Sequence, residues 1–111
     1  MQNESIKINR PSEGKAILLP ETDITASNTP ELRGMLKTLV AEGVREMEID
    51  MTDVVMVDSS GIGLLVAAHN SLERLNGKLV VTNVSKDLLE LFKAFRLEKH
   101  FVIVPRQEPG Q

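Results

Sequence analysis

In Val57-Asp58-Ser59-Ser60-Gly61-Ile62-Gly63-Leu64-Leu65, an apolar, strand-like run gives way to a pair of hydroxyl residues and then to an amphipathic helical pattern. The change of period places Ser59 and Ser60 at the mouth of a helix. The first backbone N–H groups of a helix have no partner within it, and the helix dipole is positive at that end. A phosphate on either hydroxyl would therefore lie among hydrogen-bond donors. This junction is the main functional lead in the sequence.

Strand-like and helical patterns alternate along the rest of the chain. Residues 11–14 supply a turn for an opening hairpin, and residues 46–50 fit a buried, parallel strand. A turn at 52–53 and a nearly continuous apolar run at 54–57 then lead to the serines. The predicted strands are 5–10, 15–19, 46–50, 78–82 and an edge strand at 101–104, and the predicted helices are about 30–42, 60–76 and 86–95. This order predicts a single α/β domain in which helices pack against a mixed central sheet of four to five strands.

Particular residues mark where the helices begin and end. Thr29 is a predicted N-cap, Pro30 suits the first helical position, and Gly43 is a predicted stop. Gly77 is expected just beyond the second helix, and Ser85 is expected to cap the third. The helices are thus bounded by local signals.

Right-handed crossovers would bring Asp58 and Ser59 to the carboxyl edge of the sheet, where open α/β sheets commonly place their sites. The loop 20–25 leaves an earlier strand and is expected to lie beside them. Asp23, Asp53 and Asp58 lie in three such loops, and hard oxygen ligands of this kind can hold magnesium. Solvated loop and cap carboxylates are far more common, so no metal site is predicted.

The composition argues against several classes of function. The chain has 111 residues, 41% of them apolar, and only three aromatic residues, which suits one domain with an aliphatic core. It has no cysteine and two histidines, which argues against disulfides, thiolate nucleophiles and the common zinc sites. A net charge of −3 without a basic stripe argues against nucleic acid. No apolar run approaches the roughly 18 residues that span a bilayer, and the first residues lack signal-peptide features. We expect a cytoplasmic protein without a membrane partner.

Two structural roles compete with a functional one at the serine pair. By residue type alone, an Asp or Ser before a helix is most often only a cap, and Ser60 is the better candidate for a hydroxyl that bonds the first helical turn. Gly61 and Gly63 are explained equally well by close backbone approach. A lone Gly-x-Gly is weak evidence for a nucleotide site.

A serine hydrolase is the main enzymatic alternative, because Ser59 follows an apolar run and precedes a helix, as a nucleophile elbow does. The elbow is incomplete, since Val57 stands where its first glycine is required. His69 lies further along the same predicted helix, about 15 Å away by helical rise, and cannot reach Ser59. His100 falls in a late turn. The sequence therefore predicts no catalytic site, and we expect a protein that is not an enzyme.

Several features together resemble a known family. The segment Asp58-Ser59-Ser60-Gly61-Ile62-Gly63 is accompanied by Asp23 after the second strand, by an Asn76-Gly77 break before 78–81, and by Leu91-Phe92 in the last helix. In this combination the chain resembles the bacterial anti-sigma factor antagonists of the STAS domain family. The resemblance implies a STAS-like domain at 6–104. We expect flexible termini at 1–5 and 105–111.

The resemblance also implies a function. In such proteins the first serine of the pair accepts a phosphate from a partner anti-sigma factor that is a serine/threonine kinase, so Ser59 would be the acceptor. The unmodified protein binds that kinase and frees the sigma factor, and phosphorylation releases the kinase. The kinase binds the ATP, and a phosphatase is expected to restore the unmodified form. The partner-binding residues carried over by position are Asp23, Asp58, Ser59, Ser60, Gly61 and Gly63.

Two segments depart from the family pattern. Relatives tend to have Gly-Glu-Leu-Asp where this chain has Pro20-Glu21-Thr22-Asp23, and a glycine where this chain has Arg96. Pro20 fixes φ and removes an N–H group, so this loop is where partner choice would change. The alternative function is that of a STAS interaction subunit of a transport or stress-sensing assembly without phosphoregulation.

The effect of a phosphate follows from its charge. On Ser59 it would add about −1.5 to −2 charges near Asp58 and Asp23. The helix N-terminus tolerates an anion locally. We therefore expect phosphorylation to act by repulsion and bulk at a docking face rather than by melting the domain.

Overall fold

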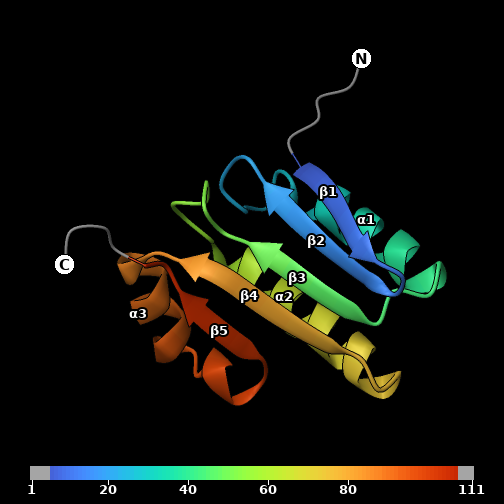
Figure 1. Cartoon of the computed structure of the whole chain (residues 1–111). Coiled ribbons are helices and arrows are strands. Elements are labelled where there is room, and N and C mark those ends of the chain that lie inside the picture. The colour runs from blue at the N-terminus through green and yellow to red at the C-terminus, as the bar shows by residue number, and fades with distance from the viewer. Residues whose placement is uncertain (1–5, 108–111) are drawn as a thin grey trace.

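The computed structural model describes residues 6–107 and shows a five-stranded mixed sheet with three α-helices (Figure 1). The strands follow the order β1-β2-β3-β4-β5, with β1 antiparallel to β2 and every other pair parallel. The predicted α/β class and mixed sheet are confirmed. The elements are β1 (Ile6–Ser12), β2 (Lys15–Pro20), α1 (Thr29–Ala41), β3 (Glu46–Asp50), α2 (Ser59–Arg74), β4 (Lys78–Val84), α3 (Lys86–Ala94), the 3-10 helix η1 (Leu97–Lys99) and β5 (Val102–Pro105).

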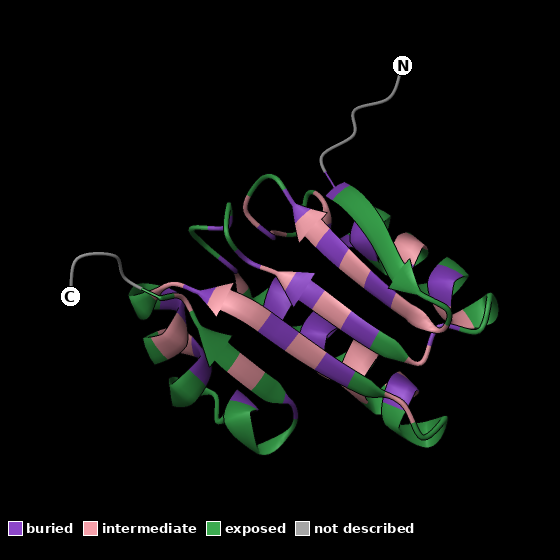
Figure 2. Ribbon diagram, in the orientation of Figure 1, coloured by how far each residue is buried: buried purple, intermediate pink, exposed green. Residues whose placement is uncertain are grey.

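The core lies between the sheet and its helices. Figure 1 shows α1 and α2 on one side of the sheet. Along the central strands, buried residues alternate with half-buried ones, as Figure 2 shows, because successive side chains point to opposite faces. Leu18, Ile49 and Val81 are fully buried at corresponding positions of β2, β3 and β4. The core is aliphatic apart from Phe92 and Phe101, as the composition predicts.

The first helix begins differently from the prediction. Asn28, not Thr29, is the N-cap residue of α1, and its side chain makes no capping hydrogen bond. The Asn28 side chain instead ties the preceding loop together: its Nδ2 donates to the backbone oxygen of Asp23 (2.6 Å) and its Oδ1 accepts from the N–H of Thr25 (2.9 Å). The N–H of Thr29 already bonds to the oxygen of Thr25 (3.0 Å), so Thr29 belongs to the helix and Pro30 follows it.

The second helix runs over Ser59–Arg74, which is earlier at both ends than the predicted 60–76. Beyond it, Asn76 takes the left-handed conformation with φ of 63°, the role expected of Gly77. Gly77 is required for a different reason: a Cβ there would lie 2.3 Å from the backbone oxygen of Arg45. The predicted cap of α3 is confirmed, since Ser85 Oγ accepts from the N–H of Leu88 (3.2 Å).

The apolar run 54–57 does not form a regular strand. Its only pairing is an isolated parallel bridge between Ile24 and Val57 within residues 6–107. Val55 and Met56 are exposed. The backbone N–H groups of these two residues are bonded to a carboxylate of another loop, so they are not available for a ladder.

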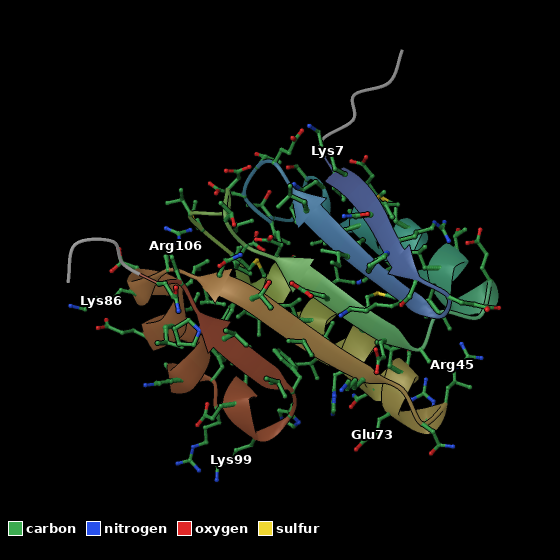
Figure 3. All side chains as sticks on the ribbon, in the orientation of Figure 1. Lys7, Arg45, Glu73, Lys86, Lys99 and Arg106 are labelled. Carbon is green, nitrogen blue, oxygen red and sulfur yellow. The ribbon has the colours of Figure 1, made fainter. Side chains whose placement is uncertain are left out.

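The carboxyl-terminal part of the sheet extends beyond residue 104. Pro105 belongs to β5, and the backbone N–H of Arg106 donates to the oxygen of Val84 (2.8 Å). The Arg106 guanidinium donates to the oxygen of Thr52 (2.8 Å), beside the ends of β4 and β5 where Figure 3 labels it. The flexible tail predicted from residue 105 therefore does not begin there. The remaining predicted flexible residues, 1–5 and 108–111, lie outside the described part of the chain.

Candidate functional site

The candidate site lies where β2 and β3 end, and it joins two loops to the start of α2. The loop 21–28 follows β2, and the loop 51–58 follows β3. They are linked at the Ile24–Val57 bridge, where the N–H of Ile24 donates to the oxygen of Met56 and the N–H of Asp58 donates to the oxygen of Ile24 (both 3.1 Å). The loop after the second strand thus lies beside the serine pair, as the topology predicts.

Asp58 caps α2 and also fastens the two loops together. Its Oδ1 accepts from the N–H of Gly61 (3.0 Å), and its Oδ2 accepts from the N–H of Ala26 (3.0 Å). The hydrogen bond from Gly61, with further backbone donors at Ala26 and Ser60, outweighs desolvation and holds the pKa of Asp58 below its usual 3.8. The carboxylate is therefore ionised near neutral pH.

Asp23 holds the second loop from the other side. Its Oδ1 accepts two hydrogen bonds, from the N–H of Val55 (2.9 Å) and from the N–H of Met56 (3.0 Å). Asp23 and Asp58 are therefore both committed to backbone donors of the opposite loop. Each carboxylate shapes the site through hydrogen bonds as well as through its charge.

The two serines are exposed at the start of α2. Ser59 is the first residue of the helix and Ser60 the second. Within residues 6–107, neither hydroxyl makes a hydrogen bond, so the expected bond from Ser60 to the first helical turn is absent and Asp58 provides the cap. The Oγ of Ser59 is consequently accessible, next to a helix N-terminus that favours an anion.

The two glycines have different roles. Gly61 is buried, and a Cβ there would lie 2.5 Å from Cγ1 of Val57 and 2.9 Å from the backbone oxygen of Ile24. It allows α2 to start against the inter-loop bridge. Gly63 is exposed, and a Cβ there would meet no atom within 4 Å. Close backbone approach therefore explains Gly61 and not Gly63.

The competing chemistries find little support in the geometry. Within the described part of the chain, no group of three or more His, Cys, Asp or Glu side chains is placed to hold a metal ion. The ring of His69 lies 5.8 Å from that of His100 and 6.1 Å from that of Phe101, and its Nε2 lies 3.4 Å from Oε1 of Glu73. His69 is thus engaged further along α2 and not at Ser59. Among residues 6–107 there is also no helix with the length and apolar character needed to cross a bilayer.

Sequence reasoning missed three contributors to this site. Ala26 supplies a backbone donor to Asp58, Asn28 ties its loop, and the pair Val55 and Met56 projects into solvent. A signal existed for Asn28, because Asn in a turn commonly bonds nearby backbone groups. The exposure of Val55 and Met56 had no such signal, since apolar residues in a row usually indicate burial.

The chain matches known proteins along most of its length. The STAS domain model matches residues 7–108. The anti-sigma-B factor antagonist of Listeria monocytogenes is 32% identical over 92 residues, which cover 82% of this chain and 80% of the relative. The anti-sigma-B factor antagonist of Bacillus subtilis is 30% identical over 88 residues, covering 79% and 80% respectively.

Solved structures share the fold at low sequence identity. An anti-sigma factor antagonist from Mycobacterium paratuberculosis superposes with a TM-score of 0.79 at 20% identity, covering 90% of this chain and 84% of that one. The phosphorylated form of the Bacillus cell fate determinant SpoIIAA superposes with a TM-score of 0.72 at 16% sequence identity, covering 88% of this chain and 89% of that one. A sulfate transporter family protein from Wolinella succinogenes superposes with a TM-score of 0.74 at 19% sequence identity, covering 86% of this chain and 80% of that one. The chain therefore belongs to the STAS domain family, and its curated relatives named here are anti-sigma-B factor antagonists.

Proposed function

We propose that this chain is an anti-sigma factor antagonist controlled by phosphorylation of Ser59. The unmodified form binds an anti-sigma factor that is a serine/threonine kinase, and the sigma factor held by that kinase is freed. Phosphorylation ends the complex. The names of the relatives support the family role, and the exposed hydroxyl of Ser59 at the start of α2 is the observation that carries the switch.

The chain is the substrate in the proposed reaction and not the catalyst. The partner binds ATP, the Oγ of Ser59 forms a bond to the γ-phosphorus, the bond to the bridging oxygen of ADP breaks, and a base on the partner takes the hydroxyl proton. A phosphatase then hydrolyses the ester. No cofactor of this chain is needed. The reaction takes place in the cytoplasm, where the sigma factor acts.

Electrostatics explain why the modified form would leave. A phosphate brings about −1.5 to −2 charges to a position next to the ionised Asp58, in a chain whose net charge is already −3. The positive end of the α2 dipole stabilises the anion within this chain. The complex has to accommodate both its charge and its volume against the kinase surface, and charge repulsion with desolvation disfavours that.

The test compares the wild type with Ser59→Ala, Ser59→Asp and the control Ser60→Ala. Each chain is used to capture proteins from the cytosol of its own organism, and the bound kinase is identified and purified. Wild type, Ser59→Ala and Ser60→Ala should bind it with similar Kd, while Ser59→Asp should bind at least about tenfold more weakly. Incubation with the kinase and ATP should add one phosphate to wild type and to Ser60→Ala, and none to Ser59→Ala.

Two outcomes would contradict the proposal. Equal binding of Ser59→Asp and wild type would remove the repulsive mechanism. A partner that binds normally while Ser59 is never phosphorylated, in the test tube or in cells, would identify the chain as an interaction module without phosphoregulation. Peptide mass mapping of Ser59 distinguishes the second outcome directly.

A further inference from the structure

We propose that the side chains of Val55 and Met56, here called the 55–56 knob, insert into an apolar pocket of the anti-sigma factor kinase and anchor it beside Ser59. The inference rests on the proposed function and names the part of this chain that supplies apolar contact. Val55 is 77% exposed and Met56 is 52% exposed, although both belong to types that normally lie in a core. Two adjacent apolar side chains next to the modification site form an interaction surface.

The knob is held outward by its buried flanking residues and by hydrogen bonds to the neighbouring loop 21–28. Its flanking residues Val54 and Val57 are 1% and 4% exposed, so both ends of the loop are fixed in the core. A single oxygen, Oδ1 of Asp23, accepts from the N–H groups of Val55 and Met56, and the oxygen of Met56 accepts from the N–H of Ile24. Backbone bonds thus orient a pair of apolar side chains toward solvent. Because the loop is ordered before binding, little conformational entropy is lost when a partner covers it.

The knob lies close in the sequence to the proposed phosphorylation site. Met56 lies three residues before Ser59, and Asp58 between them is bonded to the same neighbouring loop. A kinase that brings its catalytic cleft to Ser59 Oγ has to cover this loop. Apolar anchors at the centre of an interface carry a large share of binding energy, and methionine adapts to pockets of irregular shape. The knob therefore supplies affinity, and the hydroxyl of Ser59 supplies the switch.

The first test replaces the knob by Val55→Ser with Met56→Ser and measures Kd for the purified kinase that the wild type captures. The matched control is Val102→Ser, an apolar residue of similar exposure (55%) at the first position of β5, at the other end of the sheet. We expect the double variant to bind at least about tenfold more weakly and the control to bind within about twofold of wild type. Circular dichroism of all three chains should be the same, because the substituted side chains are exposed.

The second test uses the absence of cysteine from the chain, which makes a new thiol a unique attachment site. A benzophenone maleimide on Val55→Cys should cross-link to the kinase, and the same reagent on Val102→Cys should not. Normal binding by the double variant, or equal cross-linking from both positions, would overturn the knob while leaving the Ser59 switch intact. A wild-type chain that binds no kinase would overturn both. Loss of binding in the double variant together with unimpaired binding of Ser59→Asp would retain the knob and refute the switch.

Discussion

Two glycines that lie two positions apart in α2 differ in the space available for a side chain. Gly61 sits against the side chain of Val57 and the backbone of Ile24, whereas Gly63 faces open space. A methyl group added at the first position must displace a backbone oxygen, and one added at the second only restricts the unfolded chain.

We expect the two Gly→Ala variants to move stability in opposite directions. Gly61→Ala should lower the free energy of unfolding by about 1–3 kcal/mol, the usual range for overpacking. Gly63→Ala should raise it by about 0.5–1 kcal/mol, because alanine is the better helix former. Urea unfolding followed by circular dichroism measures both. A Gly63→Ala chain less stable than wild type would contradict the assignment of open space.

Arg96 adopts a backbone conformation that is energetically unfavourable for residues other than glycine. It adopts φ of 57°, in the left-handed region where glycine is favoured. The side chain is exposed, and its replacement leaves the core unchanged.

Arg96→Gly should therefore stabilise the fold by about 0.5–1 kcal/mol, since relief of the left-handed strain exceeds the added entropy of the unfolded chain. Thermal unfolding should show a higher Tm. The comparison variant is Arg96→Ala, which keeps the Cβ and should show no such gain. Equal Tm values for the glycine and alanine variants would show that the backbone conformation is not the source of the effect.

At the scale of elements, the start of α2 depends on one carboxylate that serves both a helix and a neighbouring loop. Asp58 accepts from Gly61 within the helix and from Ala26 outside it, and these bonds lower its pKa. Asp50, at the end of β3, also has a lowered pKa: burial alone would raise it, but hydrogen bonds from Thr52 and Asn83 outweigh that effect. The stability of the end of β3 and of the start of α2 therefore depends on the ionisation of these two carboxylates.

The sign of that dependence follows from proton binding. A lowered pKa in the folded state means that the unfolded state binds more protons at acid pH. The stability that these two carboxylates contribute is therefore fully present above about pH 5 and is lost as the pH falls through their folded-state pKa. We expect wild type to show this decline and Asp58→Asn to show a shallower one, with lower stability near neutral pH. Urea midpoints between pH 7 and pH 3 measure it, with Asp53→Asn as the control for removing one exposed loop acid. An Asp58→Asn chain with the wild-type slope would contradict the assignment.

At the scale of the whole molecule, the proposed switch changes the surface and spares the fold. Ser59 is exposed and its hydroxyl makes no bond within residues 6–107, so no internal contact is broken when it is modified. The phosphate would move the net charge from −3 to about −5.

We expect phosphorylated protein to unfold with a free energy within about 1 kcal/mol of the unmodified chain, because the helix N-terminus offsets local repulsion by Asp58. Helix content by circular dichroism should be unchanged, while binding to the kinase is lost. The control is dephosphorylated protein from the same preparation. A phosphorylated chain that loses helical signal or unfolds several kcal/mol more easily would mean that the switch works by melting the domain.

The amino-acid pattern is sufficient to predict the order of strands and helices, the aliphatic core and the position of the serine pair at the start of α2. These features depend on periodicity and capping, which act between residues close together in the chain. The same local reasoning placed the start of α1 one residue late, because the side chain of Asn28 is bonded to its own loop.

The contacts of the site residues depend on the tertiary structure. Asp58 bonds to Ala26, and Asp23 bonds to Val55, each across 32 residues of sequence. These contacts hold the loop 54–57 so that Val55 and Met56 are exposed, and the bridge between Ile24 and Val57 leaves no room for a side chain at Gly61. A carboxylate can accept hydrogen bonds from the backbone of a distant loop only after the sheet has brought the two loops together. Local sequence patterns do not predict which distant loops will lie side by side.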